Sequence, residues 1–282
     1  MDRARLILDA DCAQSLGYTG KGVGIAVLDT GLSPLEDFLL PENRISVFKD
    51  FIGDFTHCYD NNGHGTHVCG IVCGSGFLSG GRYHGIAPKA NLIVLKILDK
   101  MGRGSTAAAL RAIQWVMENK SKYNIRIVNM SVGTSDRSIN SALVSAMYQA
   151  WDSGICIIAA DGNMGSGNIS IAAAGRSKKI ITVGSYENTA YDCDITAPGV
   201  DIVSCMSPNY SFSFHGRSRK KAIGRNYIMM SGTSMATPMV SGAAALLIEK
   251  RPSLSPNNIK SLLINSSGEN KLLNIRKLIS SI

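Results

Sequence analysis

Apolar residues gather in two alternating patterns along this chain. In the first pattern nearly every position of a short run is apolar, which is typical of strands buried on both faces of a parallel sheet. Such runs predict strands over residues 23–28, 92–98, 125–130, 155–159 and 180–183.

The second pattern places apolar residues at helical spacing between those runs. It predicts helices over residues 106–120, 138–151 and 239–249. No linker, repeat or low-complexity tract interrupts the alternation. The sequence therefore predicts an α/β fold with a doubly wound, mostly parallel sheet and helices on both faces, formed as a single domain over residues 1–282.

The composition is that of an ordinary globular protein, with 282 residues of which 45% are hydrophobic and 18% charged. No apolar run approaches the length of a membrane span, and the run within residues 1–9 is too short for a secretory signal. The seven cysteines form an odd set without paired metal-type spacing, so reduced thiols are their simplest account. These observations predict a cytoplasmic protein without membrane contact.

Basic residues outnumber acidic ones 29 to 21, which gives a net charge of +8, and much of the excess lies in residues 215–225. Because no aromatic platform is interleaved with these charges, nucleic-acid binding is not expected. Basic loops are usually solvated and have no such role, but recruitment of acidic substrates, or self-cleavage within this loop, is favoured over nucleic-acid binding. Nothing in the sequence indicates an oligomeric state.

Ser234 lies in a run of small residues, 230–238, that leads into the apolar helical pattern. This position puts its hydroxyl at a helix N-terminus, where unpaired backbone N–H groups stabilise a developing negative charge. A nucleophile is favoured there. Serine is also among the commonest helix N-caps, so the position by itself leaves both interpretations open.

A serine hydroxyl needs a base and a group that orients the base, and the chain offers both. His64 follows an Asn/Gly turn and is expected in the first turn of a helix that ends near Gly74. Asp29 closes the apolar run 23–28 and is expected at the carboxyl end of a buried strand. Sites of open α/β sheets lie at such strand ends.

Three motifs resemble those of the subtilisin-family serine proteases. They occur in that family's order, Asp then His then Ser: Ala26-Val27-Leu28-Asp29-Thr30-Gly31, Gly63-His64-Gly65-Thr66-His67-Val68 and Ser231-Gly232-Thr233-Ser234-Met235-Ala236-Thr237-Pro238. The resemblance covers about residues 16–267. Residues 207–210 and 227–234 look most like those of bacterial intracellular subtilisins.

The resemblance implies a serine endopeptidase that works through an acyl-enzyme. Ser234 would be the nucleophile, His64 the general base and Asp29 the group that orients the imidazole, while Asn163 would donate to the oxyanion. Two alternatives concern the histidines. His64 could be a satisfied helix-terminal histidine, and His64 with His67 could bind zinc, although no carboxylate completes a His-Glu-x-x-His pattern.

Members of this family bind a polypeptide as an added β-strand. The resemblance implies that two backbone segments grip the substrate and that a pocket beside them takes the residue before the cut. The matching residues are Gly102, Arg103, Gly104, Ser131, Val132, Gly133, Ala160, Asp161 and Gly162, with Ile171 and Ala172 near the pocket floor. This floor predicts broad or apolar specificity, and Arg103 could bias other subsites toward acidic residues.

Two departures from the family pattern lie near the expected cleft. Asp161 stands where relatives usually carry a small uncharged residue, and it could weaken oxyanion binding, have a raised pKa, or point into solvent. The segment 185–193 is shorter than usual, which would change the leaving-group side. Both leave open an alternative: a weakly active or inactive relative that acts as a regulatory or binding protein.

Residues 74–81 offer no carboxylate at the place where many relatives hold calcium, so that site is expected to be absent and no cofactor to be required. A calcium site elsewhere stays open. About twenty residues precede the first core segment, so the chain either folds without a prosegment or is a mature fragment. Cys69 and Cys73 are expected to be small buried residues, with a reactive Cys69 as the alternative. The glycines at 20–24 precede their strand, which excludes a dinucleotide fingerprint.

Overall fold

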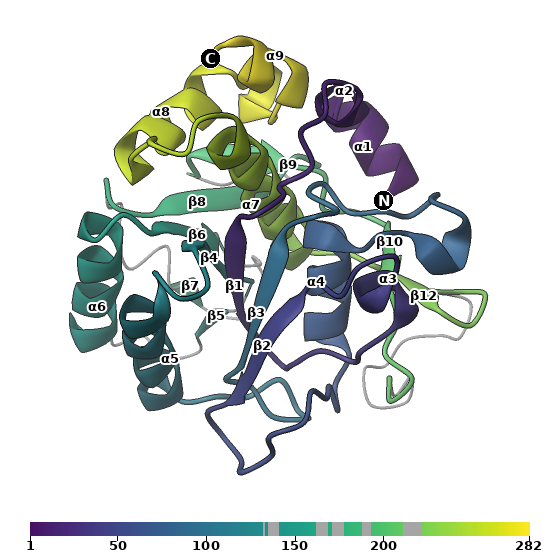
Figure 1. The fold of residues 1–282 in the computed structure, drawn as a ribbon, viewed down its shortest axis with the longest axis vertical. Coiled ribbons are helices and arrows are strands. Elements are labelled where there is room, and N and C mark those ends of the chain that lie inside the picture. The colour runs from purple at the N-terminus through teal and green to yellow at the C-terminus, as the bar shows by residue number, and fades with distance from the viewer. Residues whose placement is uncertain (132, 135–140, 162–168, 171–177, 188–192, 211–220) are drawn as a thin grey trace.

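The computed structural model describes residues 1–131, 133–134, 141–161, 169–170, 178–187, 193–210 and 221–282 (Figure 1). Its centre is a sheet of seven strands in the order β2-β3-β1-β4-β6-β8-β9, in which each neighbouring pair is parallel. The strands are β1 (Gly24–Asp29), β2 (Ile45–Asp50), β3 (Asn91–Lys96), β4 (Ile125–Met130), β6 (Cys156–Ala160), β8 (Ile181–Ser185) and β9 (Ile195–Ala197).

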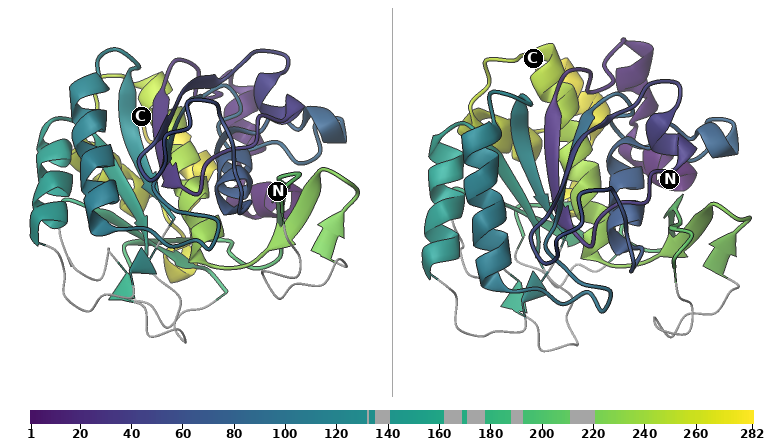
Figure 2. Two further views of the ribbon diagram at one scale, coloured as in Figure 1. Left: turned by 90° about the horizontal axis from the view of Figure 1, so that it is seen from below. Right: turned by 60° about the horizontal axis from the view of Figure 1, so that its bottom comes forward.

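Helices cover both faces of this sheet, as the sequence predicts. On one face, α5 (Thr106–Asn119) packs against α6 (Ser141–Asp152). On the other, α4 (His64–Cys73) packs against α7 (Thr233–Lys250), and α7 lies along β4, β6 and β8. Figure 2 shows the sheet between these two pairs of helices. The α/β fold class is therefore confirmed.

Small residues let α7 lie close to its neighbours. It is buried along almost its whole length, and its Gly242 has no room for a side chain, because a Cβ there would lie 2.6 Å from Ile86 Cβ. α4 is equally crowded at Gly70, where a Cβ would lie 2.4 Å from the hydroxyl of Ser204. This close packing fixes the two helices that carry His64 and Ser234 against the sheet.

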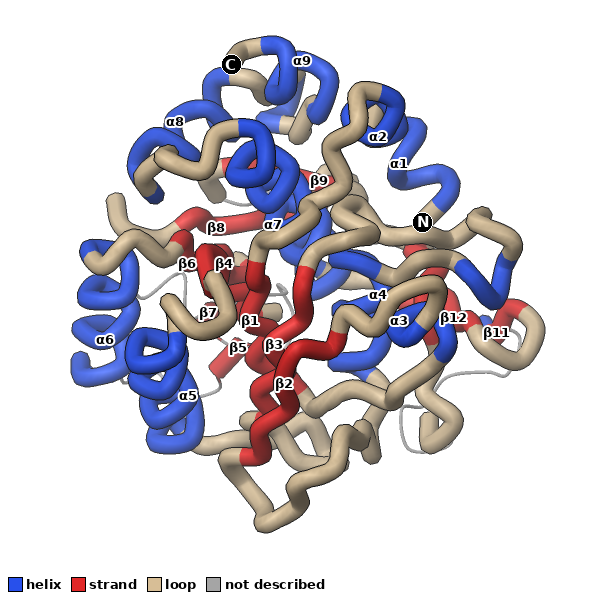
Figure 3. Tube along the Cα trace, viewed as in Figure 1, coloured by secondary structure: helices blue, strands red, loops and turns tan. Residues whose placement is uncertain are grey.

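The remaining elements lie around this core (Figure 3). An antiparallel sheet in the order β10-β12-β11 and a small pair of strands, β5 with β7, accompany the main sheet. Their bounds are β10 (Ile202–Cys205), β11 (Ala222–Ile223), β12 (Tyr227–Met230), β5 (Gly133–Thr134) and β7 (Ile169–Ser170). The short helices are α1 (Asp2–Leu8), α2 (Asp11–Ser15), α3 (Glu36–Leu39), α8 (Pro256–Asn265) and α9 (Ile275–Ser280), with 3₁₀ turns η1 (Phe77–Ser79) and η3 (Glu269–Lys271).

The five predicted strands are present, and all of them match within two residues at each end. The strand predicted over 92–98 ends two residues earlier than expected, at Lys96. β2 was not predicted, because it is an edge strand whose residues are half-buried or exposed and it lacks a continuous apolar run. α7 begins at Thr233 rather than Met239, so Pro238 lies inside the helix. The predicted start of α6, at residues 138–140, lies outside the described residues.

Candidate active site

Asp29 is the last residue of β1, and its side chain is 1% exposed. One carboxylate oxygen accepts a hydrogen bond from the N–H of Thr30 at 2.7 Å, and both oxygens face Nδ1 of His64, at 2.8 and 3.0 Å. The predicted position at the carboxyl end of a buried strand is therefore confirmed. Because a buried carboxylate only accepts hydrogen bonds, Nδ1 of His64 is the nitrogen that carries the proton.

His64 is the first residue of α4, and its side chain is 26% exposed. The left-handed backbone of Gly63, with φ of 104°, turns the chain into the helix, and the N–H of His64 donates to the amide oxygen of Asn62 at 3.1 Å. With Nδ1 bonded to Asp29, Nε2 is the basic nitrogen of the imidazole. His64 thus has the orientation that a general base requires.

A close approach of two backbones brings α4 to the end of β1. Gly65 has no space for a side chain, since a Cβ there would lie 2.2 Å from the carbonyl oxygen of Gly31. Its N–H donates to the hydroxyl of Thr30 at 2.9 Å. The glycine after His64 is therefore what allows the imidazole to reach Asp29.

Ser234 is the second residue of α7, so its hydroxyl lies at a helix N-terminus, as predicted. The hydroxyl donates to the carbonyl oxygen of Ser131 at 2.8 Å. Ser131 follows β4, the neighbour of β1, and it lies two residues beyond the paired positions Val27 and Asn129, as Asp29 does. Asp29, His64 and Ser234 therefore all lie at the carboxyl edge of the main sheet.

Ser131 is held in turn by a buried chain of polar side chains. Asn129 donates from its amide nitrogen to the hydroxyl of Ser131 at 3.0 Å, and its amide oxygen accepts from Ser241 of α7 at 2.8 Å. All three residues are at most 1% exposed. The helix that carries Ser234 is thus joined to β4 at two points, its N-terminus and Ser241.

His67 is fully buried, and its Nε2 lies 3.1 Å from the carbonyl oxygens of both Ile202 and Ile228. Burial is the main cause that lowers its pKa to about 3, and the neighbouring His64 adds to it. His67 is therefore neutral at physiological pH, and its Nε2–H serves the backbone. Its Nε2 thus has a structural role, and the alternative of a zinc site with His64 finds no group of three possible ligands among the residues that the structure describes.

The predicted substrate segments lie on the same edge where the structure describes them. Gly102 has a left-handed backbone, Arg103 is exposed, and Gly104 forms a bridge with Leu98. Ala160 ends β6 and is buried. Gly133 pairs with Ser170 in the small sheet, and Ser131 is 1% exposed. The predicted residues Val132, Gly162, Asn163, Ile171 and Ala172 lie outside the described residues.

Asp161 follows β6 and is half-buried, and its N–H donates to the carbonyl oxygen of Val183 at 2.9 Å. After burial, the charge of Asp161 is the next cause that raises the pKa of Cys193. The three predicted effects of Asp161, weaker oxyanion binding, a raised pKa or a side chain that points into solvent, stay predictions.

Three residues that hold the site together were missed by the sequence reasoning: Lys96, Asp60 and Asn62. Asn62 joins the histidine segment to the predicted substrate segment, because its amide nitrogen donates to the carbonyl oxygen of Lys100 at 3.0 Å while its oxygen accepts from His64. One signal was available for Lys96, which is a charge at the end of an otherwise apolar run. Asp60 and Asn62 resemble ordinary turn residues in the sequence.

Across the residues that the structure describes, no group of three or more His, Cys, Asp or Glu side chains could hold a metal ion. Near the loop 74–81, the carboxylate of Asp37 accepts from the N–H of Leu78 at 2.8 Å and from the hydroxyl of Tyr227 at 2.6 Å. A cation would have to displace these bonds. The absence of calcium from this loop stays a prediction.

The seven cysteines are free thiols. Cys69 and Cys73 are fully buried on α4, and burial raises the pKa of both thiols, that of Cys73 to about 12. Because the thiolate is the reactive form, neither can act as a nucleophile at neutral pH. Burial thus favours the expectation of small buried residues over the alternative of a reactive Cys69.

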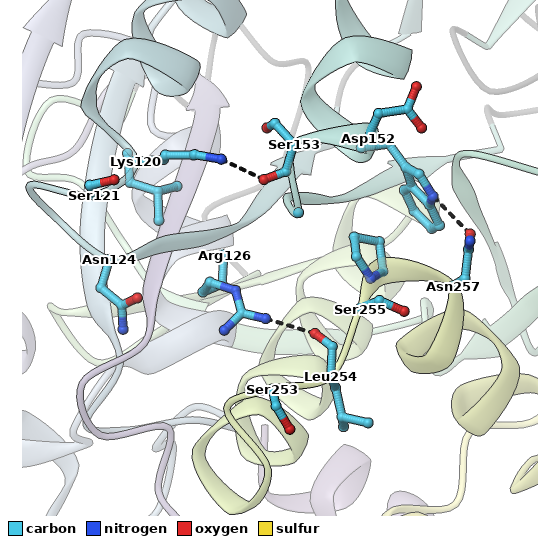
Figure 4. Close-up of a pocket in the computed structure, with 14 residues that line it drawn as sticks. Lys120, Ser121, Asn124, Arg126, Asp152, Ser153, Ser253, Leu254, Ser255 and Asn257 are labelled. Atoms are coloured by element: carbon cyan, nitrogen blue, oxygen red, sulfur yellow. Dashed lines mark hydrogen bonds between the residues drawn. The ribbon is translucent and has the colours of Figure 1, made fainter.

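A cavity of about 520 Å³ lies at the opposite, amino edge of the sheet (Figure 4). It is bounded by the start of β4, the ends of α5 and α6, and the segment that leads into α8. Its cations are already bonded: Lys120 donates to the carbonyl oxygen of Ser153, and Arg126 donates to those of Pro252 and Leu254. This cavity is separate from the triad.

No helix within the described ranges is both long and apolar enough to cross a membrane.

Known proteins resemble this chain over most of its length. Residues 20–276 match the family model described as "Subtilase family". The chain is 40% identical over 279 residues to "Serine protease AprX" from Bacillus subtilis (strain 168), an alignment that covers 88% of this chain and 62% of that protein. With "Subtilisin DY" from Bacillus licheniformis it shares 30% identity over 272 residues, covering 93% of this chain and 89% of that one.

Among solved structures, the crystal structure of a cold-adapted subtilisin-like serine proteinase matches with a TM-score of 0.69 and 31% sequence identity. The match covers 92% of this chain and 87% of the other. The chain spans less than two thirds of the length of AprX and of two further relatives, at 62% to 63%. The family match over most of the chain and the identity to these relatives together show that the chain belongs to the subtilase family.

Proposed function

We propose that this protein is a serine endopeptidase that hydrolyses peptide bonds through Asp29, His64 and Ser234. The observation that carries the proposal is the bond between Nδ1 of His64 and the buried carboxylate of Asp29, at the sheet edge where α7 presents the hydroxyl of Ser234. The relatives support this proposal, since one of them is named as a serine protease, AprX, and another as a subtilisin, Subtilisin DY.

Catalysis begins with a rotation of the Ser234 hydroxyl from the carbonyl oxygen of Ser131 toward Nε2 of His64. As Oγ attacks the substrate carbonyl carbon, Nε2 takes the hydroxyl proton and Asp29 stabilises the imidazolium. The imidazolium then gives this proton to the leaving amine, the C–N bond breaks, and an acyl-enzyme remains. Water hydrolyses the acyl-enzyme by the same proton transfers and restores Ser234.

The tetrahedral intermediate carries a negative oxygen that needs donors. The backbone N–H of Ser234 is available for this because it belongs to the first turn of α7, whose N–H groups have no partner within the helix. Asn163 is the proposed second donor, by its place in the family motif. Losing such a side-chain donor costs about a hundred- to a thousand-fold in kcat, a magnitude measured in a subtilisin.

The substrate is a polypeptide that adds as a strand between residues 102–104 and 131–133, because the described residues of both segments lie at the carboxyl edge of the sheet. The bond between Asn62 and the carbonyl oxygen of Lys100 ties the first of these segments to the histidine loop. Apolar or broad specificity before the cut is the proposed preference. Arg103 is exposed and free to meet acidic residues elsewhere in the substrate.

We extend the proposal to the boundaries, the location and the cofactor requirement. Residues 1–282 form one peptidase domain, because α9 packs against both α2 and α7 and so joins the two ends to the core. Seven unpaired thiols support a reducing, cytoplasmic location. The triad chemistry itself uses no metal, so activity that survives EDTA is expected, and loss of activity restored by Ca²⁺ would contradict this part.

The proposal is tested by intact-mass measurement after exposure to a fluorophosphonate probe, together with cleavage of an internally quenched peptide. We expect one adduct and cleavage in the wild type, and neither in Ser234→Ala. Ser145→Ala, an exposed serine on α6, is the matched control and should behave as wild type. A folded wild-type protein that neither reacts with the probe nor cleaves peptide contradicts the proposal and favours the regulatory alternative.

A further inference from the structure

Lys96 is the one charged residue of β3, and it is fully buried at 0% exposure. Transfer of an ammonium group into a protein interior costs several kcal/mol unless the group is paired and hydrogen-bonded. Burial lowers the pKa of Lys96 accordingly, against the opposing effect of nearby carboxylates. An aliphatic side chain would fill the same space at lower cost. The groups that the ammonium binds should therefore explain why a lysine is buried at this position.

All three protons of the Lys96 ammonium have acceptors. Nζ donates to the carbonyl oxygen of Thr30 at 2.5 Å, to that of Leu98 at 2.8 Å and to the amide oxygen of Asn61 at 3.0 Å. The ring of Tyr59 lies over it at 4.9 Å. These acceptors belong to the turn after Asp29, the turn after β3 and the loop before His64. One buried cation thus joins the three segments.

Asp60 holds the same region from the other side. It is fully buried, and its two carboxylate oxygens accept five hydrogen bonds. The donors are the hydroxyl of Thr30 at 2.9 Å, the N–H groups of Asn62 at 3.0 Å and Gly63 at 2.8 Å, and the N–H and hydroxyl of Thr66 at 2.9 and 2.6 Å. Four of these donors belong to the loop and first turn of α4.

Thr30 lies between the two charges, and each of its polar groups is used. Its carbonyl oxygen accepts from Lys96, its hydroxyl donates to Asp60 and accepts from the N–H of Gly65 at 2.9 Å, and its own N–H donates to Asp29 at 2.7 Å. Thr30 follows Asp29 in the chain, and Gly65 follows His64. The position of one triad residue relative to the other is therefore set through this threonine.

We propose that Lys96 and Asp60 are a pair of positioning residues that hold Asp29 against His64 through Thr30, and that the Lys96 ammonium also sets the charge felt by the imidazole. The inference rests on the proposed peptidase function, in which His64 is the base. Neither residue touches the substrate or the reacting atoms in that mechanism.

The charged groups around the pair determine the direction of the effect. Asp60, Asp50, Asp29 and Asp99 all act on Lys96, and the hydroxyl of Tyr59 beside it donates to Asp50. His64 itself faces Asp29 and the neutral His67. Without the ammonium, the negative charge of these carboxylates is balanced less. The imidazolium form of His64 then becomes more stable relative to the neutral form, and the pKa of His64 rises. Only the neutral imidazole is a base. On acidification, activity should therefore begin to fall at a higher pH than in the wild type.

The test is the pH dependence of kcat/KM in Lys96→Met. The acidic limb is the low-pH side of this profile, where kcat/KM falls. We expect its midpoint to move upward by about 0.5 pH unit or more and kcat to fall roughly tenfold. The matched control is Lys89→Met, which removes the same charge from an exposed position two residues before the other end of β3. This control should keep the wild-type limb and kcat.

Two further variants separate charge from geometry. Lys96→Arg keeps the charge, so its acidic limb should stay in place while the altered contacts lower kcat. Asn61→Ala removes one acceptor at an exposed residue and should lower kcat roughly two- to fivefold without moving the limb. A folded Lys96→Met with wild-type limb and kcat overturns the proposal. If Lys96→Met does not fold, wild-type kcat in Asn61→Ala overturns it.

Failure of the proposed function would be recognised separately, because the wild type would then neither react with the fluorophosphonate nor cleave peptide. In that case NMR titration of the His64 imidazole in the folded protein still tests the charge effect. The pKa of His64 should be higher in Lys96→Met than in the wild type and in Lys89→Met. Equal values in all three proteins would overturn the inference.

Discussion

The two edges of the main sheet use charged residues in opposite ways. At the carboxyl edge, Asp29, Asp60 and Lys96 are buried to 1% exposure or less and are joined by hydrogen bonds through Thr30. At the amino edge, Lys120 and Arg126 are half-buried and donate to backbone carbonyl oxygens at the ends of loops. Both edges are polar, yet only the first encloses its charges.

This difference separates the functional edge from the structural one. Charges that are removed from water interact strongly with one another, so small displacements change the pKa and orientation of a catalytic group. Charges that remain near water hold loops in place and contribute only modestly to stability. A cavity by itself does not make an edge functional, because one of about 520 Å³ lies at the amino edge, away from the triad. We therefore expect substitutions at the two edges to separate activity from stability.

The largest effect is expected from Asp29→Asn. The amide can donate to Nδ1 of His64 and so favours the wrong tautomer, which in a trypsin-type triad lowers kcat by about 10⁴. The thermal unfolding midpoint should change little in comparison. The measurement is kcat for a peptide substrate beside a melting curve, and a kcat within tenfold of wild type would remove Asp29 from the proposed triad.

His67 makes stability at the carboxyl edge sensitive to acid. Its pKa is lowered to about 3 in the folded protein, while the unfolded chain has an ordinary value near 6.5, so the unfolded state binds more protons between these values. The contribution of the neutral His67 to the free energy of unfolding is complete above pH 6.5 and is lost as the pH falls toward 3. Between pH 6.5 and 4.5 this amounts to about 2 kcal/mol.

The measurement is the free energy of unfolding in urea at both pH values for the wild type and for His67→Gln. Glutamine can still donate to the carbonyl oxygens of Ile202 and Ile228 but does not titrate. The variant should therefore lose less stability on acidification than the wild type. Equal losses in the two proteins would show that other groups cause the acid sensitivity.

Gly65→Ala should lower both stability and activity. A Cβ at this position would lie 2.2 Å from the carbonyl oxygen of Gly31, so α4 must move away from β1. Overpacking of this kind costs about 1–3 kcal/mol, and the shift separates His64 from Asp29. Gly268→Ala, where φ is −94° and the nearest atom to an added Cβ would lie at 3.8 Å, controls for the glycine substitution. An active Gly65→Ala with wild-type stability would contradict the crowded contact.

The smallest effect on activity is expected at the amino edge, from Arg126→Ala. The variant leaves the carbonyl oxygens of Pro252 and Leu254 without their donor and should lose about 1–2 kcal/mol of stability. Its kcat should equal that of the wild type at a temperature where both are folded. If kcat falls with stability, the two edges are coupled, and the contrast between them does not hold.

The sequence by itself determined five strands of the main sheet, the four helices that flank it and the three candidate residues of the triad. Continuous apolar runs give buried parallel strands because both faces are covered, and the strand that ends in Asp29 and the helix that begins at His64 follow from local patterns. The position of Ser234 at a helix N-terminus also follows from a local pattern. The edge strand β2 and the start of α7 do not, since neither has a local signal of that kind.

The tertiary structure alone decided how those residues are held together. Thr30 and Gly65 are 35 positions apart, and Lys96 and Thr30 are 66 apart, so no local pattern predicts their bonds. The same holds for the chain from Ser241 through Asn129 to Ser131. A lysine or aspartate in a sequence looks suited to solvent, and only packing determines whether it is buried. Local sequence therefore fixes which groups are available, whereas long-range packing sets their environment and with it their chemistry.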